Sequence, residues 1–241
     1  MVGALIAIEG IDGAGTTTQA RLLVDWLNQQ GLPAHLTCEP STGPVGQLIR
    51  AVLKAQTSWP LDAAAVALLF AADRVDHYQH EMRPLLQAGT HVVTDRSVYS
   101  SLAYQSLEQD LAWVDTINRL APEPDLVLYV RVPPDLARQR REARGGSPEL
   151  YDDTRMQERI SAQYDLLLGS SLDAGSWRLD PAGSDWIRRS DDRIRLDPAG
   201  SGCAILTRCP RTAIVDGALP VDRLHEQLRA LGQKVAHGDR T

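Results

Sequence analysis

The chain has 241 residues, of which 43% are hydrophobic, and a formal net charge of −6. This length and apolar content suit one sizeable domain with a buried core, and the acidic balance argues against a nucleic-acid-binding protein. No stretch reaches the roughly 18 consecutive apolar residues of a membrane span, and three scattered cysteines (Cys38, Cys203 and Cys209) without metal-site spacing favour a reducing, cytoplasmic setting.

Apolar runs alternate with helical patterns along the chain. We expect strands at 4–8, 34–37, 91–94, 126–132 and 213–215. We expect helices near 16–30, 44–55, 61–88, 99–120, 134–144, 153–168 and 220–231. This alternation predicts an α/β fold, a five-stranded parallel sheet with helices on both faces. Ligands of such sheets bind beyond the carboxyl ends of the strands.

A glycine-rich loop joins the first expected strand to the first expected helix. It matches G-x-x-x-x-G-K-[ST], the loop that cradles nucleotide phosphates, except that Thr16 stands where the lysine is expected. Gly10, Gly13 and Gly15 allow the backbone to curl around an anion, and the helix that follows adds its positive end. Thr17 occupies the position of the hydroxyl that ligates Mg²⁺. The loop predicts a phosphate site, the alternative being a turn without a ligand.

A second candidate site follows the strand expected at 91–94, where Asp95 and Arg96 stand together. An Asp after a neighbouring strand is where P-loop enzymes hold a carboxylate linked to Mg²⁺, and an arginine offers paired donors to a phosphate. Such a pair can equally be a surface salt bridge. Because the glycine loop, Glu39 and Asp95 all follow strands, we expect them at one edge of the sheet.

A duplicated segment interrupts the alternation. The seven residues from Arg178 to Ser184 recur from Arg195 to Ser201. Two copies are too few for a solenoid, and Leu-Asp-Pro-Ala-Gly is typical of a strand end that enters a tight turn. We interpret 170–208 as an insertion of one or two hairpins in a single domain that spans 1–241. It is either a decorative or oligomer-contacting insert, or a functional lid.

Several motifs resemble, in order, those of the thymidylate kinases. The run from Asp95 to Gln105 is similar to their D-R-Y-x-x-S-x-x-A-Y-Q. Further segments that resemble the family are Ile8–Gly15, Thr37–Pro40, Gly46–Arg50, Leu69–His77 and Pro124–Pro134. The resemblance covers about 1–168 and resumes near 210–231. It implies the P-loop nucleoside monophosphate kinase fold and phosphoryl transfer from ATP to dTMP, giving ADP and dTDP for dTTP biosynthesis.

The resemblance implies a set of acceptor residues. Phe70 would stack on thymine, Arg74 and Gln105 would read the base edges, and Tyr104 would pack beside the deoxyribose. Arg50 and Arg96 would clamp the monophosphate, and Asp12 would take the 3′-hydroxyl. The complete dTMP-binding set is Asp12, Glu39, Arg50, Phe70, Arg74, Arg96, Ser100, Tyr104 and Gln105.

The resemblance also implies the donor side and the metal. The ATP-binding set is Gly10, Gly13, Ala14, Gly15, Thr16, Thr17, Thr18 and Arg140, and the ligands of Mg²⁺ are Thr17, Asp95 and, through water, Glu9. The catalytic set is Asp12, Asp95, Arg96 and Arg144. Because the loop holds no arginine, the chain resembles the bacterial subgroup that supplies its cation from the lid, expected at about 141–153. Arg144 is the candidate, the alternative being an exposed basic helix face. The family further implies a homodimer.

Thr16 is the main departure from the family pattern. Three explanations stay open: an arginine from the lid or from 170–208 supplies the charge, the chain is a catalytically weakened relative that binds nucleotide, or the substitution was introduced deliberately. Two lysines against 23 arginines favour the first. Cys38 also replaces the arginine of T-R-E-P, and the lid lacks a D-R pair. A kinase for another monophosphate, such as dUMP or dGMP, is a further alternative.

Overall fold

The computed structural model describes residues 2–145, 150–151, 153–169, 195–196, 204–205 and 212–237. Most of the insertion expected at 170–208, including the first copy of the duplicated segment, lies outside the described residues, as do Cys203 and Cys209. Within the described part of that region, β5 (Arg195–Leu196) and β6 (Ala204–Ile205) pair as a short antiparallel ladder.

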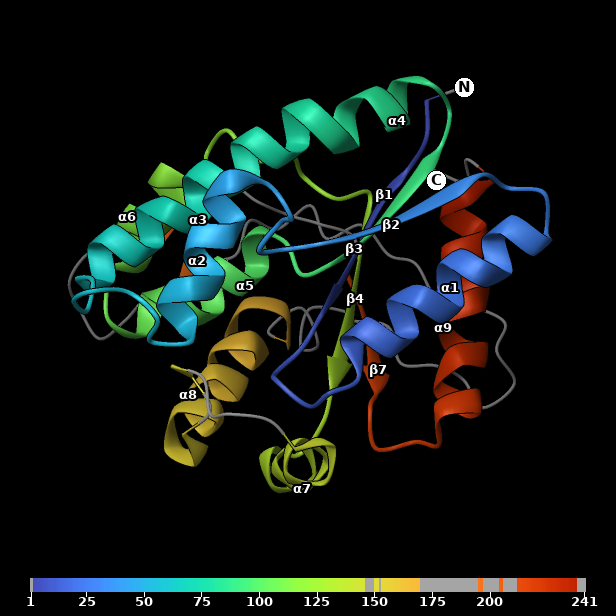
Figure 1. Ribbon diagram of the computed structural model, residues 1–241. Helices are drawn as coiled ribbons and strands as arrows, with labels where there is room; N and C mark the ends of the chain where they lie inside the picture. Colours follow the sequence, from blue (N-terminus) through green and yellow to red (C-terminus); the bar gives the residue numbers. More distant parts are fainter. Residues whose placement is uncertain are drawn as a thin grey trace.

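Five parallel strands form the central sheet (Figure 1). They are β1 (Leu5–Glu9), β2 (Ala34–Cys38), β3 (His91–Asp95), β4 (Leu126–Arg131) and β7 (Thr212–Asp216), in the order β2-β3-β1-β4-β7. The predicted sheet is therefore confirmed. Both β1 and β3 are buried along their whole length, as near-continuous apolar strands covered on both faces should be. In the register, Ile8 of β1 lies opposite Asp95, so the glycine loop and Asp95 leave the sheet side by side.

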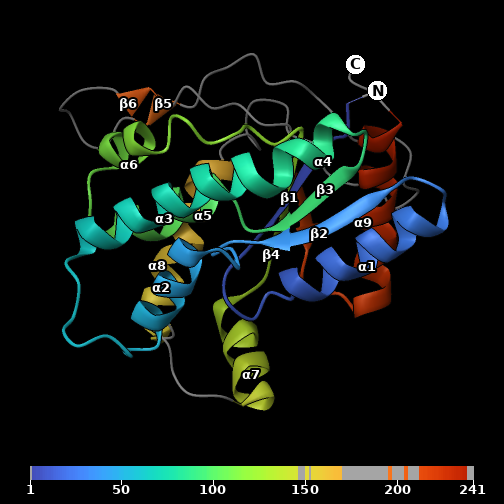
Figure 2. The same cartoon turned by 45° about the horizontal axis from the view of Figure 1, so that its top comes forward.

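Helices cover both faces of the sheet (Figures 1 and 2). On one face lie α1 (Thr16–Gln29) and α9 (Val221–Ala236). The other face carries α3 (Ala63–His77), α5 (Val98–Tyr104) and α8 (Thr154–Tyr164). The remaining α-helices of the described part are α2 (Pro44–Leu53), α4 (Arg83–Gln87), α6 (Leu111–Ile117) and α7 (Pro134–Arg144). Among the described helices, none has both the length and the apolar character needed to cross a bilayer.

Two of the long helices expected from the sequence are divided. The stretch 61–88 consists of α3, a π-helical turn η1 (Tyr78–Met82) and α4. Pro84 has no N–H to continue the α-helical ladder, and the π turn ends two residues before it, at Met82. The stretch 99–120 consists of α5, a 3₁₀ turn η2 (Gln105–Leu107) and α6. Asp110 begins α6 as its N-cap, because its carboxylate accepts a hydrogen bond of 2.9 Å from the backbone N–H of Trp113.

The two C-terminal helices also differ from their expected lengths. The helix expected at 153–168 ends as α8 at Tyr164, and a π-helical turn η3 (Asp165–Gly169) follows it. The last helix, expected to end near 231, continues through Gly232 to Ala236. A Cβ on Gly232 would lie 3.0 Å from Leu23 Cδ1 of α1. This close approach explains why a glycine stands inside α9, where it packs against α1.

Candidate active site

Two cavities meet at the carboxyl edge of the sheet. The first, of about 540 Å³, is lined by residues 12–19 of the glycine loop and α1, by Gly217–Val221 and by Leu224; we call it the loop cavity. The second, of about 410 Å³, is lined by side chains of α2, α3 and α5; we call it the α3 cavity. Five residues line both cavities: Asp12, Thr17, Asp95, Arg96 and Arg144. A group that passes from one cavity to the other passes these five side chains.

The glycine loop adopts a conformation that requires glycine at two positions. Gly13 and Gly15 have φ values of +93° and +94°. A Cβ on Gly13 would lie 2.3 Å from the carbonyl oxygen of Ala137 in α7, whereas a Cβ on Gly15 would meet nothing within 4 Å. Gly15 is also the N-cap of α1, so the positive end of this helix adjoins the loop cavity. The loop is therefore shaped for an anion and packed against α7.

Thr16 brings no charge to this cavity. Its side chain is buried, and its Cγ2 lies 3.2 Å from the place that a Cβ on Gly10 would take. Among the described residues, the cations that line the loop cavity are Arg96, Arg140 and Arg144. The positive charge around a phosphate bound there therefore comes from arginines in α7 and in the loop that follows β3.

Thr17 and Asp95 form an oxygen-rich corner at the junction of the cavities. The Thr17 hydroxyl donates a hydrogen bond to Asp95 Oδ2. Asp95 Oδ1 is buried and has no hydrogen-bond partner within the described residues. In that same part of the chain, no three His, Cys, Asp or Glu side chains gather as a metal-binding group. This fits Mg²⁺, which takes one or two protein oxygens and draws its other ligands from water and substrate phosphates.

Glu9 lies away from that corner. Its carboxylate is fully buried, and it accepts hydrogen bonds from Ser97 (2.6 Å), Ser100 (2.7 Å) and Tyr164 (2.8 Å). Burial raises the pKa of Glu9, although these hydroxyl groups oppose the rise. Glu9 lines neither cavity. Ser100 links Glu9 to Arg96, because its hydroxyl donates to Glu9 and accepts from Arg96 Nη1. Contact of Glu9 with Mg²⁺ through water stays a prediction.

Arg96 is fixed at the junction by several acceptors. Its Nη1 donates to the carbonyl oxygen of Gly10 (3.0 Å) and to Ser100 Oγ (3.1 Å), and its Nη2 donates to Asp12 Oδ1 (2.5 Å). The guanidinium carbon lies 5.1 Å from the centre of the Tyr104 ring. The backbone φ of Arg96 is +78°, a region that non-glycine residues rarely adopt. This strain at a residue with so many partners is typical of a functional position.

Asp12 is held from both sides of the junction. Its carboxylate pairs with Arg96 and accepts a hydrogen bond of 3.1 Å from the Tyr104 hydroxyl. Gln157 of α8, which is fully buried, donates 3.0 Å from its Nε2 to Asp12 Oδ2. Arg141 donates to the Asp12 carbonyl oxygen at 2.5 Å. Helix α8 therefore holds the Asp12 carboxylate, and α7 holds the backbone of the same residue.

All nine residues of the predicted dTMP-binding set line the α3 cavity. Phe70 and Tyr104 supply its aromatic surfaces, and Gln105 presents a buried Oε1 that has no hydrogen-bond partner within the described residues. Arg50 donates to the Pro40 carbonyl oxygen and, at 3.5 Å, to Cys38 Sγ. Burial raises the pKa of the Cys38 thiol, so this group is uncharged at neutral pH where the family pattern has an arginine.

Arg74 differs from the other cavity residues because protein groups take most of its donors. It donates to Glu39 Oε2 (2.7 Å), Ser101 Oγ (3.0 Å), the Ser97 carbonyl oxygen (3.3 Å) and Asn118. Its side chain is 3% exposed. Arg74 therefore organises the floor of the α3 cavity, and its expected contact with the base stays a prediction.

The arginines of α7 take different positions. Arg138 pairs with Asp135 (3.6 Å) and Glu142 (3.0 Å) on the exposed face, as the alternative of a basic surface predicts for it. Arg140 and Arg144 instead line the loop cavity, and Arg144 lines the α3 cavity as well. Of the lid expected at 141–153, residues 146–149 and 152 lie outside the described residues.

The predicted site residues therefore gather closely. Of the ATP-binding set, all but Gly10 line the loop cavity, and Gly10 lies behind it, where its carbonyl oxygen meets Arg96. Sequence reasoning missed Gln157, Tyr151, Tyr164 and the segment Gly217–Leu224. No local pattern marks them, because they approach from far along the chain; Gln157 and Asp12 are 145 positions apart.

A glycine loop after β1, an Asp after β3 and two adjoining cavities at the carboxyl edge define a P-loop phosphotransferase of the nucleoside monophosphate kinase class. The thymidylate kinase family model matches residues 8–170. The chain belongs to the thymidylate kinase family.

Curated relatives agree with this match. A probable thymidylate kinase of Pyrococcus abyssi is 39% identical over 168 residues, which cover 68% of this chain and 82% of the relative. One of Thermococcus kodakarensis is 40% identical over 166 residues, covering 66% and 81%. A putative thymidylate kinase of Aeropyrum pernix is 39% identical over 165 residues, covering 68% and 78%.

Proposed function

We propose that this chain transfers the terminal phosphoryl group of ATP to the 5′-phosphate of dTMP, giving ADP and dTDP. The observation that carries the proposal is the pair of cavities that share Asp12, Thr17, Asp95, Arg96 and Arg144. Family membership sets the expected chemistry. The five residues that line both cavities, which we call the shared wall, mark the place where donor and acceptor phosphates meet.

The loop cavity binds the donor. Backbone N–H groups of the glycine loop and the positive end of α1 receive the phosphates of ATP. Thr17 Oγ1 and Asp95 Oδ1 hold Mg²⁺, and the unpartnered Oδ1 supports this role. When bound, Mg²⁺ neutralises part of the charge on the donor phosphates. The segment Gly217–Leu224 lies where it can cover the rest of the nucleotide.

The α3 cavity binds the acceptor. Arg50 and Arg96 face its phosphate, and Phe70 and Tyr104 enclose the base and the sugar. The unpartnered Oε1 of Gln105 is a hydrogen-bond acceptor, which suits the N3–H donor of thymine. Asp12, held by Arg96, Tyr104 and Gln157, takes the 3′-hydroxyl. Phosphoryl transfer then depends mainly on positioning and on charge neutralisation.

Arginine replaces the missing lysine. Arg96 is fixed between the two phosphate sites, and Arg144 reaches both cavities from the end of α7. We assign to Arg144 the lid cation of the bacterial subgroup. This assignment follows from the absence of an arginine in the glycine loop and from the uncharged, buried Thr16. We further propose, on the family resemblance, a homodimer that acts in the cytoplasm.

A panel of acceptors tests the proposal. ADP formation from ATP and Mg²⁺ is measured with dTMP, dUMP and dGMP. We expect the highest kcat/KM with dTMP, because Phe70, Arg74 and Gln105 line its base site. A higher kcat/KM with another monophosphate would reassign the substrate. Tight dTMP binding by calorimetry without ADP formation at saturating ATP would identify a nucleotide-binding relative instead.

A further inference from the structure

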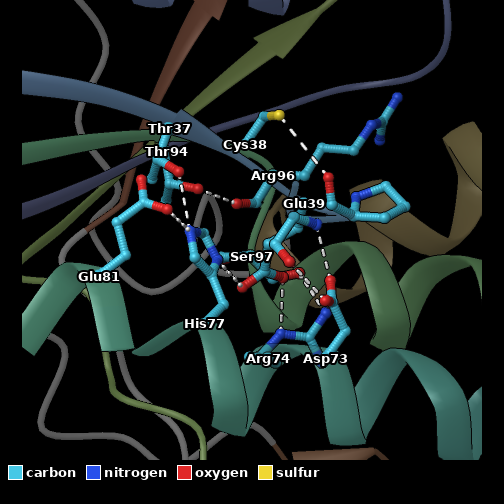
Figure 3. Close-up of polar contacts among 12 residues, drawn as sticks. Thr37, Cys38, Glu39, Asp73, Arg74, His77, Glu81, Thr94, Arg96 and Ser97 are labelled. Carbon is cyan, nitrogen blue, oxygen red and sulfur yellow. Dashed lines mark hydrogen bonds and ion pairs between the residues drawn. The ribbon is translucent and has the colours of Figure 1, made fainter. Parts of the chain in front are cut away.

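His77 is the last residue of α3 and lies behind the α3 cavity without lining it. Its side chain is 1% exposed. The ring lies between β2 and the π turn η1, with Glu39 on one side and Glu81 on the other (Figure 3). The phosphoryl transfer proposed above uses none of its atoms.

Two carboxylates face different nitrogen atoms of this ring. Nε2 lies 2.8 Å from Thr37 Oγ1 and 3.5 Å from Glu81 Oε2. Nδ1 lies 3.9 Å from Glu39 Oε1, and it is buried without a hydrogen-bond partner among the described residues. A neutral imidazole turns a lone pair toward one of the two carboxylates, whereas an imidazolium directs an N–H toward each of them. The surroundings therefore favour the protonated ring.

The charged groups around His77 favour its protonation. Burial alone would lower the pKa of His77, but Glu39 at the end of β2, Glu81 in η1 and Asp73 in α3 outweigh it and raise the pKa above its ordinary value. Two basic groups hold the same carboxylates: Arg74 pairs with the other oxygen of Glu39, and His35 of β2 lies 3.0 Å from Glu81.

We propose that His77 is a positioning residue for the acceptor site, holding the Glu39 carboxylate from behind while Arg74 holds it through its second oxygen. The inference rests on the proposed function. Arg74 Nε donates to Glu39 Oε2 at 2.7 Å, and Glu39 Oε1 faces His77 Nδ1. Because the Glu39 side chain is 5% exposed, solvent does not replace either cation. Loss of the His77 proton leaves Oε1 without a facing cation and frees the carboxylate to turn away from the acceptor.

This arrangement predicts that pH changes the KM for dTMP without a matching change in kcat or in the KM for ATP. The KM for dTMP stays constant while the ring is charged, and it rises as the pH passes above the raised pKa of His77. The kcat and the KM for ATP change little across the same range, because His77 touches neither the loop cavity nor the shared wall. A merely structural histidine would show no such selective dependence on pH.

The test compares His77→Leu and His77→Asn with the unaltered chain between about pH 6 and about pH 9. We expect His77→Leu to raise the KM for dTMP on the order of tenfold at the acidic end and to abolish its pH dependence. His77→Asn keeps an N–H donor near the place of Nδ1, so we expect it to recover part of the loss. The matched control is His80→Asn, because His80 lies on η1 with its side chain 78% exposed.

Glu81→Gln is a second, independent variant that leaves the ring in place. Removing this carboxylate lowers the pKa of His77, so we expect the rise in KM for dTMP to move to lower pH. The proposal is overturned if His77→Leu keeps the KM and pH profile of the unaltered chain, if only kcat falls, or if Glu81→Gln leaves the profile in place. If His77→Leu does not fold, Glu81→Gln decides. Turnover of dTMP by the unaltered chain tests the proposed function separately.

Discussion

Arg144 is the side chain on which the proposed donor chemistry most depends. It stands at the end of α7, is exposed, and lines both cavities. Within the described residues it has no hydrogen bond or ion pair, whereas Arg138 of the same helix is paired with Asp135 and Glu142. A cation without an assigned partner can turn toward the migrating phosphoryl group, whereas Arg138 is already held by two carboxylates on the exposed face.

We therefore expect Arg144→Ala to lower kcat by roughly 10²–10³-fold, as loss of one positioned electrostatic donor does elsewhere. The KM for dTMP should change little, because its phosphate keeps Arg50 and Arg96. Steady-state ADP formation measures both constants. Arg138→Ala is the matched control and should behave like the unaltered chain. A loss of similar size in both variants would show that Arg144 acts through the general charge of α7.

At the scale of the elements, two glycines of the same loop can be compared directly. Gly13 and Gly15 share almost the same φ, but only Gly13 abuts α7. We expect Gly15→Ala to lower the free energy of unfolding by about 1–2 kcal/mol, the cost of a left-handed conformation with a side chain. Gly13→Ala should cost more, because its Cβ would lie 2.3 Å from a backbone oxygen of α7 that has little room to move. Denaturant unfolding measures both.

Equal losses in the free energy of unfolding of these two variants would mean that the left-handed backbone conformation alone sets the cost of alanine. The loop would then not depend on its contact with α7. A larger loss for Gly13→Ala would mean that α7 supports the loop from outside. The second outcome also predicts weaker ATP binding by Gly13→Ala, since the loop must shift where it faces the donor cavity.

The strands were predictable from the sequence, and the limits of the helices were not. The structure confirms each main strand to within about two residues, and the signal is strongest for β1 and β4, where burial along the strand leaves a continuous apolar run. The divisions of 61–88 and 99–120 depend on Pro84 and on the Asp110 cap, single residues inside otherwise apolar patterns. The last helix is longer than the sequence predicts. It continues through Gly232, because this glycine allows close contact with Leu23 of α1.

The gathering of the candidate site residues at one edge of the sheet was predictable where they follow strands or lie in motifs, as Asp12, Asp95 and Arg96 do. Their supporting contacts were not. Tyr164 and Gln157 approach Glu9 and Asp12 from helix α8, and the His77 ring at the end of α3 lies 3.9 Å from the Glu39 carboxylate. Such contacts depend on how helices pack onto the sheet, and neither periodicity nor spacing encodes that packing.

At the scale of the whole molecule, most of the positive charge that lines the two cavities comes from arginine. The chain contains two lysines, and Lys54, which lines the α3 cavity, is one of them. Around the loop cavity the described cations are all arginines, from the loop after β3 and from α7. The sheet brings these distant segments to one edge, and guanidinium groups suit phosphate oxygens because they donate paired hydrogen bonds. We propose that these guanidinium groups, together with Mg²⁺, supply the positive charge that a lysine usually supplies in the glycine loop.

The rate of ADP formation from ATP, Mg²⁺ and dTMP, compared between the unaltered chain and Thr16→Lys, tests this claim most directly. We expect the unaltered chain to turn over dTMP, since Arg96 and Arg144 already stand where the two cavities meet. If the unaltered chain forms no ADP and the Thr16→Lys variant does, the arginines do not replace the lysine of the glycine loop.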